Sequence, residues 1–302
     1  MVNKIIKADK SGMTHIKEYD NMVHMINMII MGDVHGCIIT SEGGLGKSFL
    51  VRTMLEQSGR EFFVTAGHVT PLALYALMHK NKKAIILLDD VEDVLKNDVS
   101  VGVLKAALWD VKGDGKRRIT WASTSKALAK LGIPMQFDFE GAVILLCNKV
   151  PRSSDEVLKA LKTRGFELTI NLSYSQKLKI CTDMVNNQYF YKLSGVKLTK
   201  KQKEIITNTL TKETSVLMES FNFRTLIKLI KFYKYNVTYH KDDKDLYLRL
   251  LKTTIDIDKD KEIIYTLMQN SGLSIKEQVQ IFCEESGKSR ATYFRLKKML
   301  ES

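Results

Sequence analysis

Runs of consecutive apolar residues alternate with amphipathic segments along the first 172 residues of the chain. The apolar runs predict strands buried on both faces of a parallel sheet, and they lie at residues 37–39, 84–88 and 141–147. Apolar residues that recur every three or four positions predict helices, at residues 19–31, 49–55, 72–78 and 98–110. Shorter β-branched and aromatic runs predict further strands, at residues 61–65, 119–122, 136–139 and 166–172. This alternation is typical of an α/β fold with a parallel sheet.

Helical periodicity dominates the rest of the chain. The predicted helices lie at residues 174–184, 199–211, 223–235, 246–251, 261–270, 274–285 and 290–300. Residues 239–245 are polar and charged, which predicts a linker. These patterns divide the chain into an α/β domain over residues 1–172, a helical region over 173–238 and a small all-α domain over 246–302.

The charge balance narrows the choice of partner. Of 302 residues, 47 are lysine or arginine and 34 are aspartate or glutamate, which gives a formal net charge of +13 and a pI near 9.4. This surplus indicates a polyanionic partner, with nucleic acid first and an anionic membrane surface second. A lysine-rich protein without such a partner is the alternative.

Neither a membrane helix nor a secretory signal is expected. No apolar run approaches the length of a membrane span, and charged residues from Lys4 to Lys10 precede any apolar stretch, unlike in a signal peptide. The four cysteines fit no metal-ligand spacing; they are Cys37, Cys147, Cys181 and Cys283. We expect buried thiols in a reducing compartment, the cytoplasm.

The first chemical motif is residues 41–48, Ser-Glu-Gly-Gly-Leu-Gly-Lys-Ser, between an apolar run and a helix. It matches the P-loop pattern G-x-x-x-x-G-K-[ST], with Ser41 in the place of the first glycine. The motif predicts that Lys47 reaches the β- and γ-phosphates of ATP and that Ser48 binds Mg²⁺. The backbone of Glu42, Gly43, Gly44, Leu45 and Gly46 would surround the phosphates. A glycine-rich turn that happens to contain Lys-Ser is the alternative.

Polar residues follow two of the apolar runs. Asp89 and Asp90 end the run at 84–88, and Asn148 ends the run at 141–147. Ligands of open α/β sheets bind at the carboxyl ends of the strands, so we expect Asp89 to hold Mg²⁺ and Asp90 to polarise the attacking water. Glu92 is a second candidate base. Asn148 would orient this water or contact the γ-phosphate; a simple turn residue is the alternative.

Basic residues elsewhere suggest further roles. Arg164 lies between a predicted helix at 153–162 and the last predicted strand. From this position it would reach the γ-phosphate of a neighbouring subunit. Arg152 is the competing candidate for this role. The triplet at 116–118 is either a loop that faces nucleic acid or a solvated turn, with neither favoured.

The C-terminal segment predicts a helix-turn-helix. Ser274 and Glu277 form a capping-box pattern, Gly287 breaks the helix, and a basic helix follows. Four residues would contact DNA near the start of that helix: Lys288, Ser289, Arg290 and Thr292. Three more would contact phosphate: Arg295, Lys297 and Lys298. Ala291, Phe294 and Leu296 are assigned to packing. A basic helical hairpin that contacts protein is the alternative.

The order and spacing of these motifs over residues 20–235 resemble the AAA+ ATPases. The resemblance implies a P-loop sheet core with a helical lid, ATP and Mg²⁺ as cofactors, and an oligomer that hydrolyses ATP at its subunit interfaces. It also implies a lid arginine that senses nucleotide, which Arg224 matches; a solvated lid arginine is the alternative. The family ends its second motif in Asp-Glu, whereas this chain has Asp-Asp, so we expect slow hydrolysis.

The layout as a whole resembles replication initiators and helicase loaders, including phage-encoded ones. It implies an ATPase stimulated by DNA, which assembles on DNA and acts with a helicase or another replication protein. Two alternatives stay open. One is a regulator ATPase of the transposition or clamp-loading type, and the other is a slowly hydrolysing ATP switch that is a binding module and not a motor.

Overall fold

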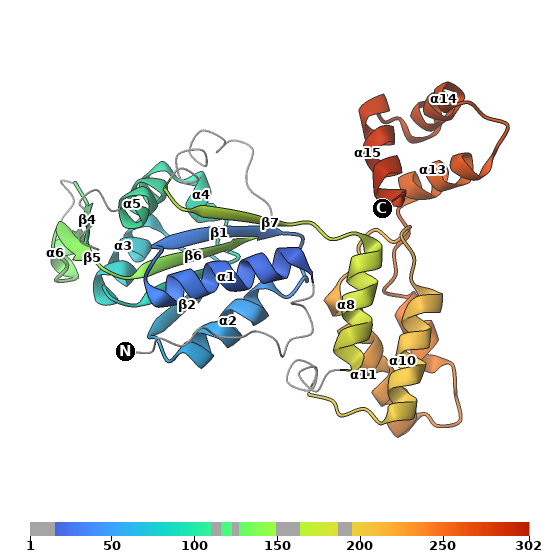
Figure 1. Cartoon of the computed structure of the whole chain (residues 1–302), viewed down its shortest axis with the longest axis horizontal. Coiled ribbons are helices and arrows are strands. Elements are labelled where there is room, and N and C mark those ends of the chain that lie inside the picture. The colour runs from blue at the N-terminus through green and yellow to red at the C-terminus, as the bar shows by residue number, and fades with distance from the viewer. Residues whose placement is uncertain (1–15, 110–115, 123–126, 149–163, 187–194, 302) are drawn as a thin grey trace. The chain divides into compact units, whose positions relative to one another are not determined.

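A computed structural model of the chain describes residues 16–109, 116–122, 127–148, 164–186 and 195–301 (Figure 1). Contacts within the chain divide it between Asn171 and Leu172 into two units. The first unit is α/β, and the second contains helices joined by turns, with one isolated β-bridge. The helix predicted at 153–162 lies outside the described residues, as does Arg152.

Five parallel strands form the main sheet of the first unit, in the order β2-β3-β6-β1-β7. Their bounds are Gly36–Ser41 for β1, Phe62–Ala66 for β2, Ile85–Asp89 for β3, Ala142–Cys147 for β6 and Phe166–Ile170 for β7. The predicted parallel α/β fold is therefore confirmed. The strand ends differ from the prediction by one or two residues.

Burial along the strands follows their position in the sheet. All residues of β3 and β6 are buried, as the unbroken apolar runs predicted, whereas the edge strands β2 and β7 are partly exposed. Residue Leu88 pairs with Leu145, and Ile39 pairs with Leu146. This register brings the carboxyl ends of β1, β3 and β6 to one edge of the sheet.

Helices cover both faces of this sheet. Their bounds are Lys17–Met31 for α1, Lys47–Ser58 for α2, Pro71–Lys80 for α3, Asp93–Lys96 for α4 and Asp98–Leu108 for α5. Residues of α3 and α5 share one apolar cluster with Ile38 and Leu145. Side chains alternate across a strand, so α1, which contacts β1, β7 and α2, covers the other face. Thr70 caps α3, and Pro71 begins it.

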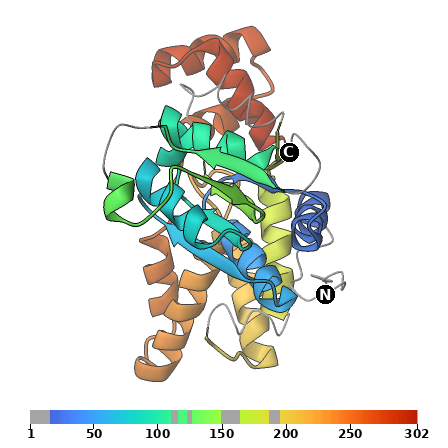
Figure 2. The same ribbon diagram turned by 90° about the vertical axis from the view of Figure 1, so that its left-hand side faces the viewer.

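A small hairpin lies at the end of the unit that faces the viewer in Figure 2. It consists of β4 (Arg117–Thr120) and β5 (Gln136–Phe139), with the short helix α6 (Ala127–Lys130) between them. Both interpretations of the triplet at 116–118 are wrong for Arg117, which is buried, donates to the Gly141 carbonyl and lies over the Phe139 ring. The strand alternation turns Arg117 inward and Arg118 outward, where Arg118 pairs with Asp138.

The second unit contains seven helices among its described residues. Their bounds are Tyr174–Asn186 for α8, Lys200–Glu213 for α10, Phe223–Tyr239 for α11, Leu246–Lys252 for α12, Lys259–Gln269 for α13, Ile275–Ser286 for α14 and Arg290–Leu300 for α15. Helices α13, α14 and α15 form an apolar cluster of their own around Phe282 and Tyr293. The Ser274–Glu277 capping box is confirmed. Every described helix of the chain is too short or too polar to cross a lipid bilayer.

The predicted linker at 239–245 begins one residue too early. Helix α11 continues through Tyr239, and the residues after it are held by the buried side chain of Asn236. Its amide donates to the carbonyls of His240 and Asp243, at 2.8 and 2.7 Å. A polar composition therefore marks a tightly bonded turn here, because one buried amide satisfies the backbone groups.

The start of β1 provides a test of this packing. A Cβ atom at Gly36 would lie 2.2 Å from Cδ2 of Leu108 and 2.5 Å from the Val143 carbonyl oxygen. We expect Gly36→Ala to lower the free energy of unfolding by about 1–3 kcal/mol, because the core must shift to admit the methyl group. Urea denaturation measures the change.

Gly102 provides the matched control. It is exposed in helix α5, and a Cβ atom there would meet nothing within 4 Å. Gly102→Ala should raise the free energy of unfolding by about 0.5–1 kcal/mol, because alanine is the better helix former. Equal effects of the two substitutions would contradict the close packing at Gly36.

Candidate functional site

The P-loop joins β1 to α2 through two glycines in the left-handed region. Gly44 has φ 79° and Gly46 has φ 78°, so both positions favour glycine. Ser41 is instead the last residue of β1 and has no positive φ. A serine therefore meets no backbone strain at this position of the motif. The Leu45 carbonyl accepts a hydrogen bond of 2.6 Å from the buried Tyr19 hydroxyl of α1.

The ammonium group of Lys47 is buried and surrounded by oxygen atoms. Its Nζ donates to the Ser41 hydroxyl at 2.8 Å, the Ser41 carbonyl at 3.1 Å and Asn148 Oδ1 at 3.1 Å. A longer bond of 3.3 Å reaches the Glu42 carbonyl. Oxygen atoms of the loop and of Asn148 thus hold the Lys47 ammonium in place.

Asp89 lies beside Ser48 at the end of β3. The Ser48 hydroxyl donates to Asp89 Oδ1 at 2.6 Å, and Arg52 Nη2 donates to Asp89 Oδ2 at 2.7 Å. The Asp89 side chain is 9% exposed, so the arginine compensates a nearly buried charge. Two adjacent hard oxygen donors, a hydroxyl and a carboxylate, fit the preference of Mg²⁺ for oxygen ligands.

Asn148 connects the loop to two more carboxylates. Its Nδ2 donates to Asp90 Oδ1 at 2.9 Å, and its backbone N–H donates to Glu92 Oε1 at 3.0 Å. With the bond from Lys47 to its Oδ1, this amide forms a continuous chain from Lys47 to Asp90. The position of the Lys47 ammonium is therefore coupled through Asn148 to that of the Asp90 carboxylate.

Asp90 has an unusual backbone. It is the one non-glycine residue with positive φ among those that the structure describes, at 56°. Aspartate tolerates this region better than most residues do, because its side chain bonds locally. The conformation aims its carboxylate at Asn148.

Burial lowers the reactivity of the thiol beside this site. Cys147 ends β6 next to Asn148, and burial raises the pKa of its thiol to about 12. The thiol is therefore protonated at neutral pH and is a poor nucleophile. Cys37 and Cys181 are buried, as expected, whereas Cys283 is only half-buried.

The chain is similar to solved structures. The structure of a point mutant of RuvB from Thermotoga maritima is 15% identical, with a TM-score of 0.53, and the match covers 94% of this chain and 87% of that one. The chain has the fold of this structure, as expected from its resemblance to the AAA+ ATPases. Two further structures from Thermotoga maritima have lower scores. The RuvB Holliday junction branch migration motor has a TM-score of 0.48 at 14% identity, covering 91% of this chain and 82% of that one. Domain III of the replication initiation protein DnaA has a TM-score of 0.49 at 14% identity, covering 84% of this chain and 100% of that one.

One curated relative has a similar sequence. It is an uncharacterised 36.7 kDa protein of the nrdC–mobD intergenic region of enterobacteria phage T4. The two are 25% identical over 177 residues, which make up 54% of this chain and 53% of the phage protein. The alignment therefore spans about half the length of that relative. No protein-family model matches the chain.

The predicted arginines of the AAA+ fold lie away from this edge or in the other unit. Arg164 precedes β7, whose Phe166 pairs with Cys37 at the start of β1. It thus lies near the amino ends of the strands. The P-loop of its own chain lies at the carboxyl end of β1, roughly 15–20 Å away along the strand. Arg224 is exposed in the first turn of α11, in the helical unit.

The predicted DNA-binding residues of α15 fall into two groups. Arg290, Arg295 and Lys298 are exposed. The others are engaged within the chain: Lys288 pairs with Asp260 and Lys297 with Glu301, while Ser289 caps the helix and accepts a bond from Thr292 N–H.

The packing predicted for this helix is partly wrong. Leu296 is buried, but Ala291 and Phe294 are exposed, and the Arg290 guanidinium lies 5.5 Å from the centre of the Phe294 ring. The buried positions are Tyr293 and Leu296, three residues apart. The helix therefore turns Phe294 outward with the arginines.

Sequence reasoning missed Arg52 and Tyr19. Arg52 follows Ser48 by four positions, which places both on one face of α2, and this spacing could have revealed it. Tyr19 comes from a helix 26 residues before Leu45, so no local pattern could have revealed its bond to the loop.

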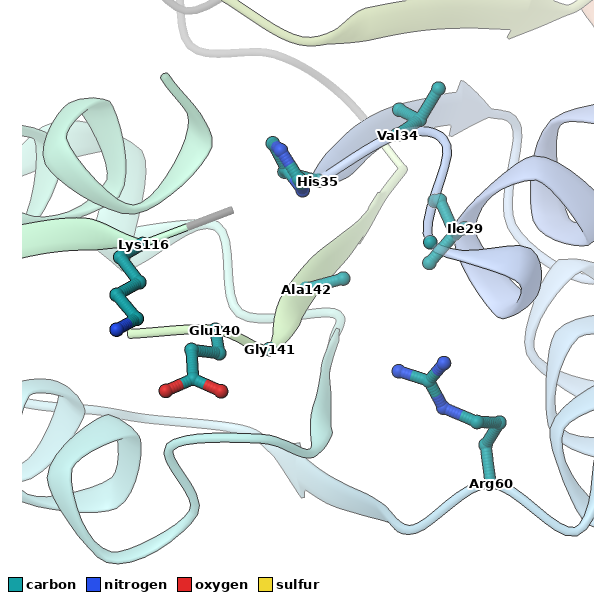
Figure 3. A pocket seen from close by; sticks show the side chains of 9 residues that line it. Ile29, Val34, His35, Arg60, Lys116, Glu140, Gly141 and Ala142 are labelled. Carbon is teal, nitrogen blue, oxygen red and sulfur yellow. The ribbon is translucent and has the colours of Figure 1, made fainter. Parts of the chain in front are cut away.

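A cavity of about 270 Å³ opens at the opposite edge of the sheet (Figure 3). Its lining includes His35, Arg60, Lys116 and Glu140, and Arg60 donates to the Ile30 carbonyl at 3.0 Å. Ala142, the first residue of β6, also lines it. Lys47 lies beyond the other end of β1, so this cavity is separate from the P-loop.

The Arg52–Asp89 pair predicts how the site responds to metal. Arg52→Ala leaves a nearly buried carboxylate without its cation, so we expect it to lower the stability of the nucleotide-free chain by about 1–2 kcal/mol, since Arg52 itself is partly exposed. Added Mg²⁺ with ATP should raise the melting temperature of this variant more than that of the wild type. Arg52→Lys, which keeps the charge, should fall between the two. An equal shift in all three proteins would contradict the prediction.

Proposed function

We propose that this chain binds ATP with Mg²⁺ at the P-loop, hydrolyses it slowly, and uses the cycle to act on DNA in replication or a related process. The role would be that of an initiator or helicase loader, assembled as an oligomer on DNA. One observation carries the nucleotide site: two hydrogen-bonded groups, Lys47–Asn148–Asp90 and Ser48–Asp89, lie at the carboxyl ends of three strands at one edge of the sheet.

The arrangement supports a separate task for each of these side chains. Lys47 would exchange the Ser41 and Asn148 oxygens for phosphate oxygens, and the loop amides would donate to the same group. Ser48 Oγ and Asp89 Oδ1 would hold Mg²⁺, which supplies charge neutralisation at the phosphates when bound. Arg52 would stay on the other oxygen of Asp89 and keep the carboxylate oriented.

The carboxylates of Asp90 and Glu92 would act on the attacking water. Asp90 would accept its proton, and Asn148 would fix the position of the Asp90 carboxylate through their 2.9 Å bond. Glu92 is anchored to the backbone of Asn148 and would serve as the substitute base. Because Arg164 lies toward the far edge of its own sheet, it would act on the phosphates of a neighbouring subunit, and Arg224 would act from the lid.

A nucleotide switch is the second candidate. Asp90 is one methylene shorter than the glutamate usual at this position. The hydrogen bond that the Asn148 side chain donates also occupies one of its carboxylate oxygens. Both features oppose efficient proton abstraction. ATP binding would then order an assembly without driving a motor.

Turnover separates the two candidates. In an ATPase assay with and without DNA, Lys47→Ala should lose ATP binding, because the ammonium that faces the phosphates is gone. Asp90→Asn should bind ATP but lose at least tenfold in rate. Asp90→Glu should hydrolyse faster than the wild type. Wild-type turnover no higher than that of Lys47→Ala would refute the ATPase and leave the switch.

The exposed face of α15 predicts the contact with duplex DNA. Arg290→Ala with Arg295→Ala should weaken binding of a DNA duplex and lower the slope of log K against log salt by about 1.8, for two lost phosphate contacts. Lys297→Ala is the matched control, because this side chain is 19% exposed and lies 3.9 Å from Glu301. Duplex binding that depends equally on all three residues would contradict this surface.

A further inference from the structure

Helix α11 carries basic and aromatic side chains along one exposed side. Lys228, Lys231, Tyr235 and Tyr239 are all exposed, and successive members are separated by three or four residues. This spacing places them on the same helix face, and we call them the α11 stripe. No aspartate or glutamate occurs between Phe223 and Tyr239. The stripe is therefore positively charged at its start and aromatic at its end.

The aromatic end is unusual for a face that only meets water. Tyr235 is 48% exposed and Tyr239 is 72% exposed. Their ring centres lie 5.5 Å apart, and the ring of His240 lies 4.9 Å from that of Tyr235. His240 Nε2 and the Tyr235 hydroxyl are 3.0 Å apart, within hydrogen-bond distance. Three neighbouring rings thus form a platform that the apolar core of the unit does not use.

The backbone beneath this platform is held in place. The buried amide of Asn236 bonds to the carbonyls of His240 and Asp243, and its oxygen accepts from Tyr247 N–H at 3.1 Å. On the inner side, the Tyr233 ring packs edge-on against Tyr247 at 5.2 Å. The rings therefore sit on a fixed backbone, which lowers the entropic cost of ordering them when they bind a partner.

We propose that the α11 stripe binds single-stranded DNA. Its ammonium groups would contact the phosphates, and its tyrosine rings would stack on unpaired bases, which is the combination that single-strand binding proteins use. A duplex keeps its base faces inside the stack, so it would leave the rings unused. The nearby Asp243 is paired with Arg249, which offsets its negative charge.

The stripe is long enough for a few nucleotides. Lys228 and Tyr239 are eleven residues apart, which corresponds to about 17 Å along the helix axis. This surface is separate from the proposed duplex contact on α15 and requires no ATP hydrolysis. It goes beyond the proposed function, since it adds a second DNA-binding surface that prefers single-stranded to duplex DNA.

Binding of a labelled oligothymidylate to the full chain, followed by fluorescence anisotropy, tests the stripe. Tyr235→Ala with Tyr239→Ala should weaken binding at least tenfold, because two stacking faces are lost. Tyr235→Phe with Tyr239→Phe keeps the rings and should bind within about twofold of the wild type. The proposal is overturned if the wild type does not bind the oligothymidylate, if the alanine variant binds as well as the wild type, or if the phenylalanine variant is as weak as the alanine variant.

Two lysine substitutions supply an independent readout. Lys228→Ala with Lys231→Ala should lower the salt slope for the single strand by about 1.4, at about 0.7 for each lost contact. An unchanged slope would overturn the proposed phosphate contacts. Both lysines are exposed, and a thermal melt verifies that the variants fold.

The α15 variant separates this proposal from the duplex contact. Arg290→Ala with Arg295→Ala should leave single-strand binding unchanged while weakening duplex binding. Loss of single-strand binding in that variant, with normal binding in the tyrosine variant, would overturn the assignment to α11.

Discussion

The parallel pairing of β3, β6 and β1 is the constraint on which the candidate site depends. Because three strands end at the same edge, residues as distant in sequence as Lys47 and Asn148 come within hydrogen-bond distance. A slip of β3 by one residue would break the bonds that Asp89 and Asp90 make, since a one-residue shift turns the side chains of that strand to the other face. The buried apolar runs therefore hold the polar chemistry in register.

Much of this arrangement could be predicted from the sequence. Unbroken apolar runs with acids or an amide at their ends specify both the buried strands and the edge at which the polar groups meet. The P-loop pattern located the loop from the sequence, and the positive φ of Gly44 and Gly46 explains why the pattern has glycine there. What remained hidden depends on contacts between elements. The inward turn of Arg117 follows from a strand that begins two residues earlier than its apolar residues suggest, and the outward turn of Phe294 follows from the rotation of α15 about its axis.

The carboxylates of Asp89 and Asp90 illustrate why a sequence motif alone does not predict the reactivity of each residue. The motif identifies Asp89 and Asp90 equally well, yet the structure gives them different surroundings. Asp89 is shared between a hydroxyl and a guanidinium, whereas Asp90 faces an amide from a left-handed backbone. Their reactivity follows from these neighbours, which lie on α2 and after β6, and no run of residues around position 90 encodes them.

The bond between Tyr19 and Leu45 has a consequence for the loop amides. A trans peptide is planar, and its carbonyl and the next N–H point in opposite directions. Holding the Leu45 carbonyl toward α1 therefore directs the Gly46 N–H away from α1. One phenolic hydroxyl thus sets the orientation of a whole peptide plane, so that this amide need not rotate when an anion binds. Part of the reorganisation energy of ligand binding is in this way removed by a helix that precedes the P-loop in sequence.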